Sequence, residues 1–499
     1  MTFSKDAFFQ SQKTTPLIEA LSTLKNQPDA AFYTPGHKRG QGIAHSLTSL
    51  VGTAVFQADL PELPELGNLF APDGAIQQAQ ILAAEAFGAD QTWFLVNGST
   101  CGIIAAIVAT CGSGDKIIVP RNIHQSVITG LIVSGAVPIF LNPEYDPIWD
   151  LAYSFTPEAL EGALKQHSDV RAVLLVYPTY HGVCGNIQAI ADVTHRYNIP
   201  LLVDEAHGGH FAFHEALPPS ALSLGADLSV QSTHKVLGAM TQASMLHLKG
   251  DRIEPQRISQ ALQLVQSTSP NYLLLASLDG ARQQMAIQGQ TLLNETIKLA
   301  EIARNELSQI EGLGVFKLEK TCPGFQYLDV TRLTVNVTSL GITGLEADEI
   351  LHNKLGVTAE LPMLSHLAFI ISIGNTQNDI KQLIKAFKSL RDFSSPPRLM
   401  SVVESPLMSV VESNPLTPSS LKLSPRDAFF APKELVGIEQ SLGRISGELI
   451  CPYPPGIPIL MPGEIITSEA IQYLIKIQKL GGMITGCSDQ SLQTFKVIK

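Results

Sequence analysis

An amine, a carboxylate and several hydroxyl and imidazole groups follow two apolar segments near the middle of the chain. Lys235 ends the segment Ser232-Thr-His-Lys, which comes directly after the strand-like run 226–231. Asp204 ends the apolar run 199–203. Pyridoxal phosphate needs a lysine that forms an imine, an anion that faces its ring nitrogen, and donors for its phosphate. The groups suited to these three tasks are Lys235, Asp204, and Ser232 together with His234.

The positions of these residues relative to the predicted strands favour a ligand site over a chance pattern. Taken alone, a four-residue motif of this kind is more often a solvated surface lysine than a catalytic one. A carboxylate at the carboxyl end of a buried strand, however, lies where open α/β sheets bind ligands. Asp204 has such a position, and so has His124, which follows the apolar run 116–120. The His124 imidazole could stack on a flat cofactor ring, and a structural histidine is the alternative.

A second candidate phosphate-binding segment lies earlier in the chain. Asn97-Gly-Ser-Thr is predicted to form a tight turn between a strand over 92–96 and a helix over 101–110. Backbone N–H groups, hydroxyls and the positive end of the helix dipole bind phosphate well at such a turn. Ser99 and Thr100 are therefore candidate phosphate ligands, although helix capping alone would also explain them.

Short apolar runs alternate with helix-length segments over much of the chain. Further strands are predicted over 137–141, 172–177, 201–203 and 228–231, and a helix over 75–88. This alternation predicts an α/β fold with a mostly parallel sheet covered on both faces. The predicted organisation is an N-terminal helix and active-site loop over 1–40, a large domain over 41–300, a small α+β domain over 301–393, a linker over 394–424 that contains a repeated segment, and a C-terminal domain over 425–499.

Composition and charge narrow the class of protein. The chain has 499 residues, of which 45% are hydrophobic and 16% charged, as is typical of a soluble globular protein of several domains. A net charge of −11 argues against binding to nucleic acid or to an anionic membrane surface, and weakly suits a cationic substrate. No apolar run approaches the length of a membrane span. The six cysteines show no paired spacing, so we expect reduced thiols and a cytoplasmic location.

A metal site is the competing interpretation of one histidine-rich segment. His207, His210 and His214 lie close to Asp204 and Glu205, and the spacing could be fitted to zinc. No closed set of spaced ligands appears elsewhere in the chain, so no metal is predicted. His207 is better used beside the cofactor.

Six segments in order resemble one enzyme family. They are Asn97-Gly-Ser-Thr, Asn122-Ile-His-Gln-Ser, Asp204-Glu-Ala-His-Gly, Ser232-Thr-His-Lys, Gln266-Ser-Thr-Ser-Pro-Asn-Tyr and Tyr453-Pro-Pro-Gly followed by Pro462-Gly-Glu. Together they resemble the ornithine/lysine/arginine decarboxylases, which are fold-type I enzymes that use pyridoxal phosphate and have an aspartate aminotransferase-like large domain. The resemblance covers most of the chain and implies decarboxylation of a basic L-amino acid within polyamine biosynthesis.

The resemblance also implies a role for each candidate residue. Lys235 would carry the cofactor as a Schiff base, Asp204 would pair with its ring nitrogen and His124 would stack on the ring. His207 would lie near the imine and the substrate carboxylate, and either His124 or Lys235 would return a proton to the α-carbon. The phosphate would be held by Ser99, Thr100, Ser232, His234 and, from a partner subunit, Thr268. The family's active site forms across a homodimer, and the candidate substrate contacts are Glu464, for the cationic end, and His37.

Departures from the family and other functions stay open at this stage. Phe70 and Ala71 stand where family members often carry a histidine pair. The wing domain and decamer of long enterobacterial members are not expected, and because shorter members are often arginine decarboxylases, arginine is favoured over lysine and ornithine. A fold-type I aminotransferase or lyase usually needs a small-domain arginine for the α-carboxylate, whereas Arg39 and Arg121 lie outside that domain. A non-catalytic regulator is the last alternative.

Overall fold

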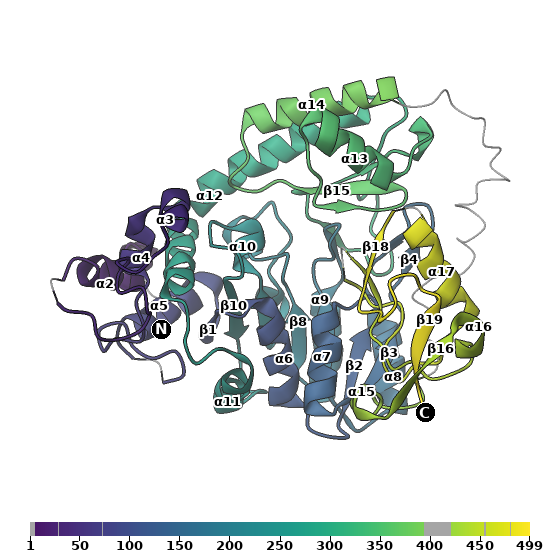
Figure 1. Ribbon diagram of the computed structural model, residues 1–499, viewed down its shortest axis with the longest axis horizontal. Helices are drawn as coiled ribbons and strands as arrows, with labels where there is room; N and C mark the ends of the chain where they lie inside the picture. Colours follow the sequence, from purple (N-terminus) through teal and green to yellow (C-terminus); the bar gives the residue numbers. More distant parts are fainter. Residues whose placement is uncertain (1–4, 28, 72, 394–420, 454–455, 480) are drawn as a thin grey trace.

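The computed structural model describes residues 5–27, 29–71, 73–393, 421–453, 456–479 and 481–499. Residues 394–420 of the predicted linker, with the repeated segment, lie outside the described residues. Figure 1 shows the large α/β region at the centre, with the N-terminal helices at one end, the small domain above it and the C-terminal region on the opposite side.

The centre of the molecule is a seven-stranded sheet with the strand order β1-β10-β9-β8-β6-β2-β3 (Figure 1). Neighbouring strands from β9 to β3 are parallel, and only β10 runs antiparallel to both its neighbours. The prediction of a mostly parallel sheet is therefore confirmed, although β10 was not predicted. The strands are β1 (Gln91–Leu95), β2 (Lys116–Pro120), β3 (Val137–Leu141), β6 (Val170–Val176), β8 (Leu201–Asp204), β9 (Leu228–Gln231) and β10 (Ser244–Leu248).

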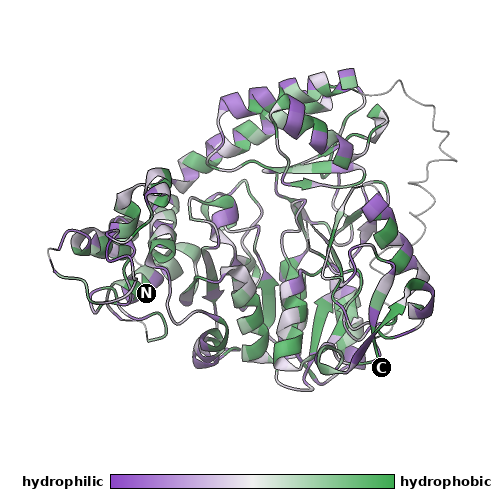
Figure 2. Ribbon diagram, in the orientation of Figure 1, coloured by the Kyte–Doolittle hydropathy of each residue, from purple (hydrophilic) through white to green (hydrophobic). Residues whose placement is uncertain are grey.

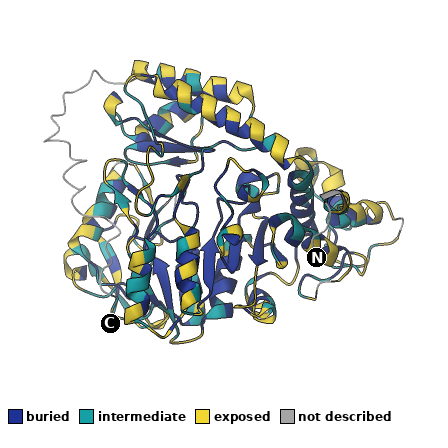
Figure 3. Cartoon of the chain, turned by 180° about the vertical axis from the view of Figure 1, so that it is seen from behind, coloured by how far each residue is buried: buried dark blue, intermediate teal, exposed yellow. Residues whose placement is uncertain are grey.

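Both faces of this sheet are buried, because successive strand residues alternate between two hydrophobic clusters. Ile118 and Val203 belong to one cluster, and Ile117 and Leu202 to the other. The strands are accordingly apolar in Figure 2 and buried in Figure 3, as expected for a parallel sheet covered by helices. The helices are α5 (Gly74–Phe87), α6 (Gly98–Thr110), α7 (Gln125–Ser134), α8 (Pro157–Gln166), α9 (Ile187–Arg196), α11 (Pro255–Val265) and α12 (Tyr272–Ser308).

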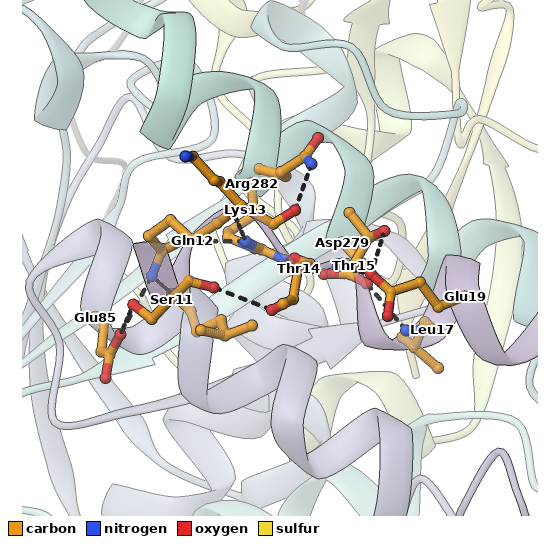
Figure 4. A network of polar contacts seen from close by, with 12 residues as sticks. Ser11, Gln12, Lys13, Thr14, Thr15, Leu17, Glu19, Glu85, Asp279 and Arg282 are labelled. Atoms are coloured by element: carbon orange, nitrogen blue, oxygen red, sulfur yellow. Dashed lines mark hydrogen bonds and ion pairs between the residues drawn. The ribbon is translucent and has the colours of Figure 1, made fainter. Parts of the chain in front are cut away.

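An N-terminal helix docks on the large domain. Leu17, Leu21 and Leu24 of α2 are buried in the same cluster as residues of α5 and α12. Arg282 of α12 fastens the preceding segment, because its guanidinium donates to the Gln12 and Thr14 carbonyl oxygens at 2.9 and 2.8 Å (Figure 4). The N-terminal helices are α1 (Lys5–Ser11), α2 (Pro16–Leu24), α3 (His45–Val51) and α4 (Thr53–Ala58).

The small domain follows from the carboxyl half of α12. Four antiparallel strands in the order β11-β13-β15-β14 carry two helices, and their apolar residues form a separate cluster. The elements are β11 (Gly314–Val315), β13 (Arg332–Asn336), α13 (Gly344–Leu355), β14 (Leu361–Pro362), β15 (His366–Ile370) and α14 (Gln377–Leu390). The antiparallel pair of β7 (Val183–Cys184) and β12 (Tyr327–Leu328) joins this region to the large domain. A second antiparallel pair, β4 (Tyr145–Asp146) and β5 (Leu151–Ala152), lies between β3 and α8 in the chain.

The C-terminal region has its own hydrophobic cluster and is attached through a buried arginine. Arg121, directly after β2, donates to the carbonyl oxygens of Pro458 and Ile459 at 2.8 and 3.1 Å and pairs with Glu464 at 3.3 Å. The elements are α15 (Pro425–Phe430), β16 (Lys433–Gly437), α16 (Ile438–Ser441), β17 (Cys451–Tyr453), α17 (Ser468–Lys479), β18 (Met483–Thr485) and β19 (Thr494–Ile498). Among the residues placed by the structure, no helix combines the length and apolar character needed to cross a membrane.

Candidate active site

A cavity of about 610 Å³ lies beyond the carboxyl ends of the central strands. Its floor includes His124, Asp204, His207 and Lys235, which follow β2, β8 and β9. The other walls come from α13 of the small domain and from α17 and the start of β18 in the C-terminal region. Three regions that are distant in sequence therefore enclose one site at the sheet edge where α/β folds bind ligands.

Lys235 projects into this cavity from a single helical turn, α10 (Thr233–Val236), that follows β9. Its Nζ atom lies 3.0 Å from Nε2 of His207 and 5.6 Å from the centroid of the Tyr180 ring. Burial lowers the pKa of Lys235, Asp204 and Glu360 oppose that effect, and Arg332 adds to it. The amine is thus moved toward its uncharged, nucleophilic form.

Asp204 is the last residue of β8 and its side chain is buried. One carboxylate oxygen accepts a hydrogen bond of 3.2 Å from the Ala206 N–H group. Burial raises the pKa of Asp204, and the charge of Lys235 and the Ala206 N–H group oppose the rise. A buried carboxylate is stabilised by a cation, so this position suits a protonated ring nitrogen.

Two hydroxyls meet at the predicted phosphate site. Ser232 Oγ donates to Ser99 Oγ at 2.7 Å, although 133 residues separate them. The sequence suggested that Ser99 and Thr100 lie in a turn ahead of the helix. Helix α6 begins at Gly98, however, so both residues lie in its first turn. Helix N-termini of this kind, with adjacent hydroxyls, bind phosphate. The buried Thr233 hydroxyl and His207 Nδ1 have no hydrogen-bond partner in the described structure, and this donor set fits pyridoxal phosphate.

Of the predicted phosphate ligands, Ser99 lines the cavity, whereas the described lining does not include Ser232, Thr100, His234 or Thr268. Thr100 is exposed, and His234 is half-buried with a pKa lowered by burial and by Lys235. Thr268 is exposed on a segment that is tied to the N-cap of α6 in the same chain, because the Ser267 N–H group donates to Asn97 Oδ1 at 3.1 Å. A contribution of Thr268 to a partner subunit's site stays a prediction.

His124 caps the amino end of α7 and lines the cavity. Its Nδ1 accepts a hydrogen bond of 3.2 Å from the Ser126 N–H group, so the ring proton belongs on Nε2. Burial and the charge of Lys235 lower the pKa of His124 to about 4. A neutral, fixed imidazole at this place is suited to lie against a flat aromatic ring.

The two candidate substrate contacts lie elsewhere in this chain. His37 uses both ring nitrogens locally, as Nε2 is 3.2 Å from Asp59 and Nδ1 accepts from the Gly40 N–H group at 3.1 Å. Glu464 is fully buried, pairs with Arg121 and accepts from the Met461 N–H group at 3.0 Å. Neither lines the cavity among the described residues, so this geometry gives their predicted roles no support.

The three histidines whose spacing could be fitted to zinc contact different partners. His207 contacts Lys235, His210 lies 3.2 Å from Asp329, and His214 bonds to Asn294. Each imidazole is thus explained by its own contact.

Sequence reasoning missed several residues that the fold brings to the site. Tyr180 and His181 line the cavity and follow β6, so the rule that selected Asp204 and His124 would also have found them. Asp150 lines the cavity from the β4–β5 hairpin, and Arg332 stands behind His207. Neither of the latter two carried a local sequence signal.

Comparison with known proteins places the chain among enzymes of one kind. It matches the models described as "Orn/Lys/Arg decarboxylase, major domain" over residues 15–379 and "Orn/Lys/Arg decarboxylase, C-terminal domain" over 418–490. A protein named arginine decarboxylase from Bacillus subtilis is 39% identical over 497 residues, covering 98% of this chain and 99% of the relative. The arginine decarboxylase of Halalkalibacterium halodurans is 40% identical over 490 residues, covering 98% of each. The solved lysine decarboxylase of Francisella novicida shares the fold, with a TM-score of 0.84 at 23% identity, covering 98% of this chain and 82% of that one.

Proposed function

The chain belongs to the Orn/Lys/Arg decarboxylase family, and from that premise we propose that it is a pyridoxal-phosphate enzyme that converts arginine to agmatine and CO₂. The expected fold-type I architecture agrees with the shared fold of the solved relatives. Arginine is favoured over lysine and ornithine because two relatives that match along their whole length are named arginine decarboxylase.

The observation that carries the proposal is the convergence of Lys235, His207 and Asp204 in one cavity. When bound, the cofactor supplies an electron sink for the bond that breaks at the α-carbon. Asp204 would hold the ring nitrogen protonated, His124 would lie against the ring, and the hydroxyls of Ser99 and Ser232 would bind the phosphate with Thr100 and His234 beside them. Lys235 can return a proton to the α-carbon after CO₂ leaves, and His207 can share that proton.

The charge of the cavity wall supports a cationic substrate. Carboxylates of Asp150, Asp348 and Glu349 line it, whereas Lys235 is the one lysine or arginine among the described lining residues. Asp150 is the most enclosed of the three, since burial raises its pKa and its carboxylate accepts a hydrogen bond from the Tyr145 hydroxyl. Apolar neighbours such as Leu151 and Ile477 suit the methylene groups of a basic side chain.

The cavity lining counts against an aminotransferase, because it includes no arginine among the described residues. An arginine that clamps the α-carboxylate would stabilise the very group that a decarboxylase must release. Arg39 pairs with Asp29 at 2.8 Å and Arg121 with Glu464 at 3.3 Å. In the small domain, Arg332 donates to the His207 carbonyl oxygen at 3.1 Å and is not among the described residues that line the cavity.

We further propose that the active enzyme is a homodimer. Apolar side chains on the N-terminal region support this, since Phe32 is 94% and Leu50 is 80% exposed, and α3 buries none of its residues. Thr268, also exposed, would then face the partner's site.

The test is identification of the product. Cofactor-loaded protein is incubated separately with arginine, lysine and ornithine, and the products are separated by mass. Agmatine from arginine supports the proposal, cadaverine or putrescine would move the preference to lysine or ornithine, and a 2-oxo acid without CO₂ would point to transamination.

A further inference from the structure

A second buried cation stands next to the Lys235 site, and nothing in the proposed mechanism so far uses it. Arg332, the first residue of β13 in the small domain, is 1% exposed. One of its terminal nitrogens donates to the carbonyl oxygen of His207 at 3.1 Å. His207 in turn contacts the Lys235 amine at 3.0 Å, so the chain of contacts runs from the small domain to the reactive lysine.

The charge on Arg332 is held in place by an ionised carboxylate. Nε of Arg332 lies 3.5 Å from Asp329 Oδ2, and His210 contacts the same oxygen at 3.2 Å. Burial alone would raise the pKa of Asp329, but His210 and Arg332 lower it to about 2. Burial lowers the pKa of Arg332, and Asp329 is the largest influence that opposes it.

The Arg332 side chain packs against Gly182, a position where no side chain would fit. Gly182, with a φ of +82°, packs against it so closely that an added Cβ would lie 2.9 Å from the Cβ of Arg332. The Gly182 carbonyl also accepts from the Asp329 N–H group at 2.9 Å. The loop that carries Tyr180 and His181 therefore rests on Arg332, which touches two walls of the cavity without lining it.

The charged and titratable groups around the Lys235 amine come from five segments. Asp204 and Glu360 favour its charged form, and Arg332 opposes it. Burial and Lys235 lower the pKa of His124 and of His207, so these two face the amine as neutral groups. Tyr180 contacts the amine with its ring and donates to Glu360 at 3.0 Å. Arg332 is thus the fixed positive charge in this set, and its second terminal nitrogen has no hydrogen-bond partner within the described structure.

We propose that Arg332 is a positioning residue that fixes His207 against Lys235 and places a buried positive charge beside the lysine amine that takes up the cofactor aldehyde. The proposal rests on the proposed function, since it takes Lys235 as the cofactor lysine. A protonated amine cannot attack an aldehyde, so a fixed positive charge nearby widens the pH range in which the lysine reacts.

The test measures Lys235 itself and not turnover. Cofactor-free protein is mixed with pyridoxal 5′-phosphate between about pH 6 and pH 10, reduced with borohydride at set times, and labelling of Lys235 is counted by peptide mass spectrometry. In Arg332→Met the midpoint of the rate against pH is expected to move up by about half a unit to one unit. Arg332→Lys keeps the charge and is expected to keep a midpoint close to the wild type.

Asp329→Asn is the matched control, because it breaks the same buried network but retains the positive charge of Arg332. Its midpoint is expected to stay or to fall, whereas purely structural damage would move both variants alike. If Arg332→Met fails to fold, the double variant Arg332→Met/Asp329→Asn removes both charges together and is expected to show the same upward shift.

An unchanged midpoint in Arg332→Met or in the double variant, or an equal upward shift in Asp329→Asn, would overturn the inference while leaving the proposed function intact. Absence of label on Lys235 in the wild type would overturn the proposed function and this inference with it.

Discussion

The Nε2 atom of His207 lies 3.0 Å from the amine of Lys235, although 28 residues separate them. Burial lowers the pKa of both side chains, and at this distance one nitrogen can pass a proton to the other. His207→Gln is expected to lower kcat by about tenfold to a hundredfold with little change in KM. CO₂ release measures this, with His167→Gln, at the end of α8 and not among the described lining residues, as the control. A wild-type kcat in His207→Gln would remove His207 from the mechanism.

The hydroxyls of Ser99 and Ser232 are expected to bind the cofactor phosphate as a unit. Their mutual hydrogen bond of 2.7 Å means that losing either one also disturbs the other. Each alanine substitution should raise the dissociation constant of pyridoxal phosphate about fivefold. The double variant should raise it by less than the product of the two single increases. Absorbance titration of cofactor-free protein gives the dissociation constants, with exposed Ser308→Ala as the control. Fully independent effects would argue against a shared phosphate contact.

Asp150 is expected to bind the cationic end of the substrate. Its carboxylate lies in the cavity among apolar side chains and beside the Tyr145 hydroxyl. Asp150→Asn should raise KM for arginine about tenfold or more while changing kcat little, because the charge-assisted contact that is lost would be made to the non-reacting end of the substrate. Asp348→Asn, in the same cavity but less enclosed, should change KM by about twofold or less. The reverse order of the two variants would place the cationic end against α13.

Asp329 should stabilise the fold at neutral pH. Its pKa is lowered from 3.8 to about 2 in the folded protein, so the unfolded chain binds a proton first as pH falls. The stabilisation is complete above the unfolded pKa and is lost as pH falls through the folded pKa. Asp329→Asn should therefore be less stable by about 1–3 kcal/mol at pH 7, with the difference narrowing below about pH 4. Urea unfolding at several pH values checks this, and a difference that does not change with pH would contradict it.

Local patterns predicted the framework well because parallel strands are continuous apolar runs with polar residues after them. The ranges 116–120 and 137–141 match β2 and β3, and Asp204 does end β8. β10 was missed because it is antiparallel, and the connection from β9 contains only the single turn α10 instead of a full crossover helix.

Residues that act through tertiary contact were beyond prediction from the sequence. Arg332 is an ordinary strand residue until the small domain folds onto His207. Glu464 was a candidate contact for the cationic end of the substrate, yet the C-terminal region buries it against Arg121. The two residues of each pair lie more than a hundred positions apart in the chain. Local sequence patterns cannot indicate such contacts.

The most direct test of the central claim is release of labelled CO₂ from arginine carrying the label in its carboxyl carbon. Wild-type protein loaded with pyridoxal phosphate is expected to release it at a higher kcat/KM for arginine than for lysine or ornithine labelled in the same way, and Lys235→Ala is expected to release none above background. Release that persists in Lys235→Ala, or no release from any of the three substrates by cofactor-loaded wild type, would contradict the account.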